Sequence, residues 1–168
     1  ADPHCTYKEF GKRAGARSLR SWFTATPKLF YPRNIEKKYD IGFSGALHGS
    51  GKIEGPTRDL RSRIREILKS NDSYNTFWNG SDSVSPRIKD VEEYSNKINE
   101  CKVWLSTTGP MLDIGPRYFE VALSKTLLFC NNMPEQYEGV FVDGKNCVMF
   151  ENDLSNFEEK LKYYLKHE

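Results

Sequence analysis

The sequence is poor in the residues that hold metal ions or build disulfide frameworks. Its 168 residues include 4 cysteines and 3 histidines, and Cys5, Cys101, Cys130 and Cys147 show no C-x-x-C spacing. The pattern therefore argues against a structural zinc site and against a disulfide-dense scaffold. We expect Cys101, Cys130 and Cys147, each in apolar company, to be buried free thiols. The spacing selects no pair for a single disulfide.

Long apolar runs and a strong net charge are also missing. No stretch of about 18 apolar residues is present to span a bilayer, and no apolar signal-peptide region stands near the N-terminus. A net charge of +2 predicts no strong attraction to nucleic acid or membranes. The composition is that of a soluble globular protein. Sequons at Asn71 and Asn79 would accept glycans in a secretory pathway, so the compartment stays open between cytoplasm and secretory lumen.

The common phosphate-binding signatures are absent as well. The chain has no G-x-x-x-x-G-K-[ST] motif, no G-x-G-x-x-G after a strand and no D-x-D carboxylate pair. It has instead the stretch 105–120, in which an apolar strand opens into a loop rich in glycine and proline and then into a helix. Backbone N–H groups near Pro116 and the Arg117 guanidinium attract anions, and Glu120 can accept hydrogen bonds from ribose hydroxyls. The alternative is a helix begun by Pro116 with both charges on a solvated face.

From Tyr39 onward, short apolar runs alternate with amphipathic stretches. Strands are predicted over 39–43, 75–78, 102–105, 126–130 and 147–150, and helices over 57–69, 86–99, 116–124 and 154–165. Inward helix positions are Leu60, Ile64, Ile67 and Leu68 in one helix, and Ile88, Val91, Tyr94 and Ile98 in the next. The alternation predicts an α/β fold, a single Rossmann-like doubly wound parallel sheet with helices on both faces. Residues 1–37 are interpreted as a basic N-terminal arm, and residues 38–168 as the domain.

In such a sheet the ligand crevice lies at the C-terminal ends of the strands. The glycine-rich loop after the first strand begins at Gly45, and its His48 and Lys52 are either phosphate contacts or parts of a flexible surface loop. Arg58 and Arg61 share one face of the next helix. Because Arg58 falls in the predicted first turn, it is the better candidate to reach the crevice.

The loops after the second and third strands carry further candidates. Trp78 is either a platform for a base or a core residue. Ser106 and Thr107 bond a base edge or a phosphate, or else satisfy their own loop. Asp113 stands four residues before Arg117 and either orients that guanidinium or contacts the ligand.

Five segments in order carry a family resemblance: Lys38-Tyr-Asp-Ile-Gly-Phe-Ser-Gly45, the arginines Arg58 and Arg61, Gly115-Pro-Arg-Tyr-Phe-Glu120, Gly144-Lys-Asn-Cys-Val-Met-Phe150, and the helix over 154–165. Together they resemble the C-terminal, donor-binding half of a group-1 type glycosyltransferase of the GT-B fold, close to the spore-maturation-protein-like branch. The resemblance covers residues 30–168.

This resemblance implies that the chain binds a nucleotide-diphosphate sugar, such as a UDP- or GDP-sugar, without a metal. It places Gly45 beside the donor diphosphate, with Arg58 close by, and gives Glu120 the ribose. Arg117 and Glu120 are then the catalytic candidates, with the matching Pro116 before them. Many relatives carry a further glutamate where this chain has Leu112. The resemblance also implies a second, acceptor-binding domain or subunit that supplies any general base.

Two other functions fit the pattern. A non-catalytic interaction domain would keep the fold and bind a protein through the basic arm and exposed Trp22, Phe23 and Phe30. The intact Arg117 and Glu120 argue against it. A flavodoxin-like or TIR-like nucleotide domain shares the alternation of strands and helices, but the late position of the 115–120 segment disfavours it.

Overall fold

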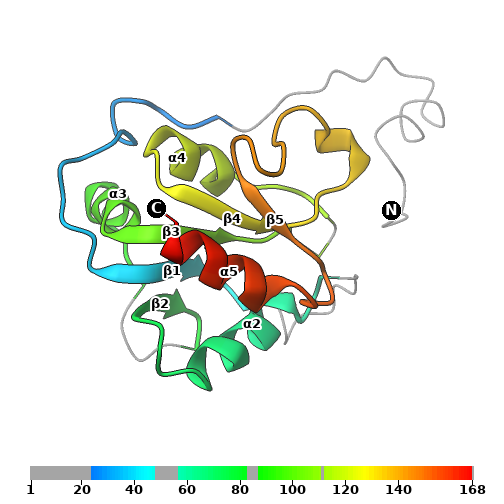
Figure 1. Ribbon diagram of the computed structural model, residues 1–168. Helices are drawn as coiled ribbons and strands as arrows, with labels where there is room; N and C mark the ends of the chain where they lie inside the picture. The colour runs from blue at the N-terminus through cyan, green and yellow to red at the C-terminus, as the bar shows by residue number, and fades with distance from the viewer. Residues whose placement is uncertain (1–23, 48–56, 83–86, 111, 168) are drawn as a thin grey trace, which may run out of the picture.

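The computed structural model describes residues 24–47, 57–82, 87–110 and 112–167 (Figure 1). Its strands are β1 (Tyr39–Gly45), β2 (Thr76–Gly80), β3 (Cys101–Ser106), β4 (Leu127–Asn131) and β5 (Val148–Phe150). Its helices are α2 (Leu60–Lys69), α3 (Val91–Asn99), α4 (Arg117–Leu123), the 3₁₀ turn η2 (Glu135–Tyr137) and α5 (Phe157–Lys166).

The five strands form one parallel sheet in the order β2-β1-β3-β4-β5. This confirms the predicted Rossmann-like α/β class. The order is one of the two common doubly wound arrangements, the one that flavodoxin also has. The chain builds outward from β1 to β2, then crosses to the other side of β1 to continue with β3. The switch point between β1 and β3 is where a crevice opens beyond the strand ends.

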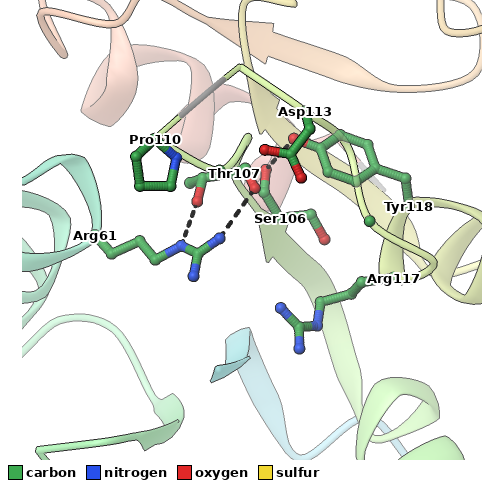
Figure 2. A pocket seen from close by; sticks show the side chains of 9 residues that line it. Arg61, Ser106, Thr107, Pro110, Asp113, Arg117 and Tyr118 are labelled. Atoms are coloured by element: carbon green, nitrogen blue, oxygen red, sulfur yellow. Dashed lines mark hydrogen bonds between the residues drawn. The ribbon is translucent and has the colours of Figure 1, made fainter. Parts of the chain in front are cut away.

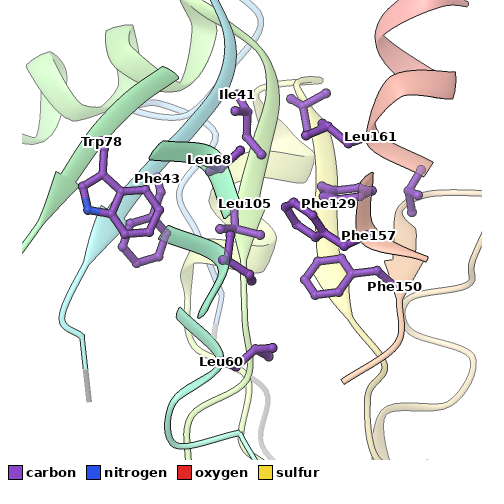
Figure 3. Packing of buried hydrophobic residues seen from close by; sticks show 13 residues of the cluster. Ile41, Phe43, Leu60, Leu68, Trp78, Leu105, Phe129, Phe150, Phe157 and Leu161 are labelled. Carbon is purple, nitrogen blue, oxygen red and sulfur yellow. The ribbon is translucent and has the colours of Figure 1, made fainter. Parts of the chain in front are cut away.

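Side chains alternate between two cores, one on each face of the sheet. Phe43, Leu105 and Phe129 point into a cluster closed by α2 and α5, as Figure 3 shows. Trp104 and Leu128, each one position away, point into a second cluster closed by α3 and α4. A strand has a side-chain period of two, so both faces of each central strand must be apolar when helices cover both.

Helix α3 begins five residues later than predicted. The side chain of Asp90 accepts hydrogen bonds from the backbone N–H of Glu92 and Glu93, at 3.3 and 3.2 Å, and so caps the helix. Val91, predicted to face inward, is 44% exposed in the first turn. Ile98 is fully buried and Tyr94 packs against the second cluster, as the helical spacing predicts.

Helix α2 begins at Leu60 instead of Thr57, because residues 57–59 form turns. The hydroxyl of Thr57 donates to the carbonyl of Gly109 at 2.8 Å, which ties this turn to the loop after β3. Leu60, Ile64 and Leu68 are buried, as predicted. Ile67 is only partly buried. Helix α5 likewise starts three residues late, at Phe157.

The described part of the predicted arm lies along α3. The hydroxyl of Ser95 donates to the carbonyl of Leu29 at 2.8 Å, and the Asn99 amide donates to the carbonyl of Tyr31 at 3.2 Å. Phe30, predicted to be exposed for a protein partner, is 5% exposed and belongs to the second cluster. That prediction is wrong because α3 and the sheet need an apolar cover at this point. Trp22 and Phe23 lie outside the described residues.

The predicted burial of the cysteines is confirmed, whereas one of the two sequons has a buried asparagine. Cys101, Cys130 and Cys147 are buried free thiols, as predicted. Asn79 is buried in β2, and its side-chain oxygen accepts hydrogen bonds from Ser44 and from the backbone N–H of Ile88. The side chain that would carry the glycan is thus not presented to solvent in the folded domain. Asn71 lies partly exposed in the turn after α2.

None of the helices within the described ranges is long and apolar enough to cross a bilayer.

Gly42 of β1 has no side chain, and the ring of Trp104 occupies the space where one would lie. A Cβ at this position would lie 2.6 Å from Cε3 of Trp104 and 2.5 Å from the sulfur of Cys101. We predict that Gly42→Ala lowers the free energy of unfolding by about 1–3 kcal/mol, the usual cost of overpacking a core. Urea unfolding measures this change. Gly115→Ala is the matched control, because its Cβ would meet no atom within 4 Å, and an equal loss in both variants would contradict the packing argument.

Candidate functional site

A pocket of about 190 Å³ opens beyond the C-terminal ends of the central strands, near the switch point. It lies between α2 on one side and the loop and helix that follow β3 on the other (Figure 2). Its lining consists of Arg61, Ser106, Thr107, Gly109, Pro110, Asp113, Gly115, Arg117 and Tyr118. The sequence rule that places ligand sites at strand ends thus agrees with a real hollow in this fold.

Arg61 reaches the pocket from the first turn of α2. Its side chain is buried, with the residue 8% exposed, and it donates to the Thr107 hydroxyl at 2.6 Å and to the Thr107 carbonyl at 3.2 Å. It also donates to the carbonyl of Ala46 at 2.8 Å. The guanidinium therefore joins the loop after β1 to the loop after β3.

Arg117 enters the pocket from the other side, at the start of α4 (Figure 2). Its Nε donates to the hydroxyl of Tyr94 at 3.0 Å. A Cβ added at Gly45 would lie 3.0 Å from Nη1 of Arg117, so the end of β1 approaches the guanidinium closely. The missing side chain at Gly45 is what leaves room for the cation.

Hydrogen bonds from three directions fasten the loop after β3. The buried amide of Asn131, at the end of β4, accepts from Thr108 N at 2.8 Å and donates to the Thr108 hydroxyl at 3.0 Å. The Tyr118 hydroxyl donates to the carbonyl of Ser106 at 3.3 Å, and Thr57 holds Gly109 from the α2 side. The pocket wall is therefore largely preformed.

The loop turns through an uncommon backbone conformation. Leu112 has φ of 60°, in the left-handed region that branched side chains adopt rarely. The N–H of Leu112 bonds to the carbonyl of Gly109 at 2.9 Å, and the N–H of Gly109 bonds to the carbonyl of Asp113 at 2.8 Å. These bonds fold the loop back and leave Asp113 on the pocket wall.

Ser106 lines the pocket and carries a buried hydroxyl. The residue is 1% exposed, and its Oγ has no hydrogen-bond partner among the described residues. A buried hydroxyl without a partner costs free energy that a bound acceptor would recover.

The electrostatics of the pocket favour an anion. The pKa of Arg61 is lowered to about 10, chiefly by burial and next by the nearby charge of Arg117, while Tyr118 and Asp113 oppose the shift. The guanidinium groups of Arg61 and Arg117 thus share the pocket with one carboxylate, that of Asp113. A bound anion would relieve the repulsion between the two cations.

Glu120 lies one turn into α4, beside Tyr94 and Arg117. Burial raises the pKa of its carboxyl, while the charge of Arg117 and the hydroxyl of Tyr94 partly offset that shift. Burial also raises the pKa of Tyr94 to about 12, so its hydroxyl keeps its proton at neutral pH. Glu120 is not one of the residues that line the described pocket, and it faces the α3 side instead.

The structure brings several predicted site residues together. Ser106, Thr107, Asp113 and Arg117 line the pocket, Gly45 borders Arg117, and Pro116 is the N-cap residue of α4. His48 and Lys52 lie outside the described residues. No ion pair joins Asp113 to Arg117 in the described part of the chain, because α4 begins at Arg117 and Asp113 is not on the helix.

Besides Glu120, two more predicted residues do not line the pocket. Trp78 belongs to the first core cluster: its ring stacks on Phe43 at 4.2 Å, its N–H donates to Asp82 at 2.8 Å, and the guanidinium of Arg65 lies over it. Arg58 precedes α2 in a turn, and Arg61 takes the pocket position that the sequence assigned to Arg58.

Sequence reasoning missed the positions of Arg61, Tyr118 and Tyr94. The signal for Arg61 was present, since an arginine in the first turn of the helix after β1 is the one that reaches the crevice. The late start of α2 moves that turn from Arg58 to Arg61. The only sequence signal for Tyr118 and Tyr94 was their helical spacing among apolar residues. That spacing predicts burial and does not show where the hydroxyl group lies.

The pKa shift of Glu120 predicts a pH-dependent effect on stability. A carboxyl with a raised pKa binds its proton more tightly in the folded state, so its stabilising contribution is present below the unfolded pKa and is lost as the pH rises through the folded one. We therefore predict that Glu120→Gln is more stable than the parent at pH 7, and that the difference disappears near pH 4. Urea unfolding at both pH values measures it. Glu138→Gln, at an exposed position, is the control, and a Glu120→Gln variant less stable at pH 7 would refute the prediction.

One of three comparisons with known proteins found a match. The family model described as glycosyl transferase-like matches residues 38–168. A search of curated proteins and a search of solved structures each found no match. The matched range holds the whole sheet and every pocket residue. The chain therefore belongs to the glycosyl transferase-like family.

Proposed function

We propose that this chain binds the nucleotide-diphosphate sugar of a glycosyltransferase, as the donor half of a GT-B enzyme of the spore-maturation-protein-like branch. One observation carries the proposal. Two arginines, Arg61 and Arg117, line one pocket at the switch point of the sheet, together with Ser106, whose hydroxyl has no hydrogen-bond partner among the residues that the structure describes. Membership of the glycosyl transferase-like family supports the same reading.

The size of the pocket suggests which part of the donor enters it. Its volume of about 190 Å³ is below the roughly 300–1,000 Å³ of pockets that enclose a drug-sized ligand. We therefore assign the diphosphate to this pocket and leave the base and the sugar outside it. Paired guanidinium groups suit the diphosphate because each presents several fixed N–H donors to its oxygens.

The same groups would act during transfer. The bond between the anomeric carbon and the diphosphate oxygen breaks, an acceptor oxygen bonds to that carbon and loses its proton to a base, and the nucleotide diphosphate leaves with added negative charge. Arg61 and Arg117 are placed to stabilise that charge, and such preorganised donors account for much of enzymatic rate enhancement. We propose that they serve here in place of a metal ion.

The acceptor side belongs to a second component in this proposal. GT-B transfer occurs in a cleft between two Rossmann-like units, and the described residues form one such unit. An acceptor-binding domain or subunit would supply the acceptor site and any general base. The donor site, by contrast, needs only the residues of this chain, so binding is the activity to measure first.

We predict saturable binding of one nucleotide diphosphate in calorimetric titrations with UDP, GDP, ADP and their sugars, with a thermal shift in parallel. Glu120→Ala should weaken that binding by about 1–3 kcal/mol, the scale of losing hydrogen bonds to a charged group, while the domain stays folded. No binding to any of these ligands at millimolar concentration would overturn the proposal. Equal affinity of parent and variant would remove Glu120 from the ribose site.

Arg61 gives a second prediction, with a matched control on the same helix. Arg61→Met removes a pocket guanidinium, whereas Arg63→Met removes one that donates to the carbonyl of Asp153 at 2.7 Å at an exposed position. Both variants lose one positive charge. We expect Arg61→Met to weaken pyrophosphate binding about tenfold or more, as for a charge-assisted hydrogen bond, and Arg63→Met to change it less than twofold. Similar losses in both variants would mean that net charge, not the pocket, binds the anion.

A further inference from the structure

The hydroxyl of Tyr94 contacts α4 at Arg117. It accepts a hydrogen bond from Nε of Arg117 at 3.0 Å, so its own proton is not used in that bond. The same hydroxyl lowers the pKa of the Glu120 carboxyl, against the larger effect of burial.

Aromatic contacts fix the ring that carries this hydroxyl. The Tyr94 ring meets the Phe30 ring edge-on at 6.0 Å and the Trp104 ring edge-on at 5.7 Å. Trp104 is fully buried in the second core cluster. The Asp90 cap holds the start of α3, one turn before Tyr94. The hydroxyl is thus held by the core of the domain and not by the pocket loop.

A fixed hydroxyl at Nε determines how Arg117 faces the pocket. The guanidinium is planar, so holding Nε at Tyr94 while Nη1 lies beside Gly45 sets the direction of the remaining N–H groups. Those groups belong to a side chain that lines the pocket. Without the phenol, the side chain would gain rotamer freedom, which costs affinity when a ligand orders it again.

We propose that Tyr94 is a positioning residue, which holds the guanidinium of Arg117 toward the pocket. Its consequence for donor binding rests on the proposed function. The hydrogen bond between Arg117 and Tyr94 belongs to the ligand-free protein and can be measured there. Tyr94 needs no contact with the ligand for this role.

The test compares Tyr94→Phe with Tyr74→Phe in the full chain. The Tyr74 hydroxyl is buried without a hydrogen-bond partner in the described structure, and the residue precedes β2, at the opposite end of the sheet from the pocket. Both variants lose one hydroxyl and keep the ring. Two NMR measurements on the ligand-free proteins report on the Tyr94 hydroxyl: hydrogen exchange of the Arg117 Nε–H that it accepts, and the pKa of the Glu120 carboxyl.

We expect Tyr94→Phe to speed exchange of the Arg117 Nε–H about tenfold or more, because its acceptor is lost. We also expect it to raise the pKa of Glu120 further, because a nearby hydroxyl that favours the ionised carboxylate is lost. Tyr74→Phe should leave both values at those of the parent. For UDP or GDP, whichever the parent binds, Tyr94→Phe should raise Kd about 3–10-fold, as for one neutral hydrogen bond.

The possible outcomes are separable. Unchanged exchange and pKa in Tyr94→Phe would overturn the inference, and so would changed NMR values with an unchanged Kd. If the parent binds neither UDP nor GDP, the proposed function fails, and the NMR values alone decide the role of Tyr94. If Tyr94→Phe does not fold, exchange in the parent decides: slow exchange of the Arg117 Nε–H supports the role, and exchange as fast as that of a free arginine refutes it.

Discussion

The site depends on keeping one charged group, the guanidinium of Arg61, nearly out of water. Burying a charge is costly unless its donors are satisfied, and Arg61 finds acceptors at Ala46 and Thr107. These residues follow β1 and β3, the strands on either side of the switch point. One side chain thus fixes the separation of the two strand ends and, with it, the width of the pocket. The lowered pKa of Arg61 reflects the burial that this arrangement requires.

The rest of the site is arranged around that cross-link. Asn131 fastens the loop after β3 from the side of β4, and Tyr118 fastens it from α4. Arg117 faces Arg61 from the opposite wall, oriented by a hydroxyl that the second core holds in place. The pocket is therefore built from both layers of helices, and the polar groups in it are supported by apolar packing outside it. Preorganisation of this kind reduces the entropy that a ligand must overcome when it binds.

Much of the fold could be predicted from the sequence, because the apolar alternation of the strands and the spacing of the helices report burial directly. The boundaries of the helices could not be predicted in this way. Asp90 begins α3 by capping it with its side chain, and the spacing of apolar residues does not show a cap. The same limit affected the site. Ser106, Thr107, Asp113 and Arg117 follow from chain order alone, whereas the choice between Arg58 and Arg61 depended on where α2 begins. Trp78 and Phe30 looked available in the sequence but lie in the cores.

The three buried cysteines are shielded from thiol reagents in the folded domain. Cys101 lies in the second core, where burial raises the pKa of its thiol to about 12, so almost none of it is the reactive thiolate at neutral pH. Cys130 and Cys147 are enclosed in the same core. Burial raises the pKa of Cys130 as well. The neighbouring Cys130 lowers the pKa of Cys147, so burial alone shields that sulfur. An alkylating reagent would meet these sulfurs only when the domain opens. The rate at which the reagent modifies these three thiols therefore measures how often the folded domain opens. The measurement needs no dye or tag on the chain beforehand.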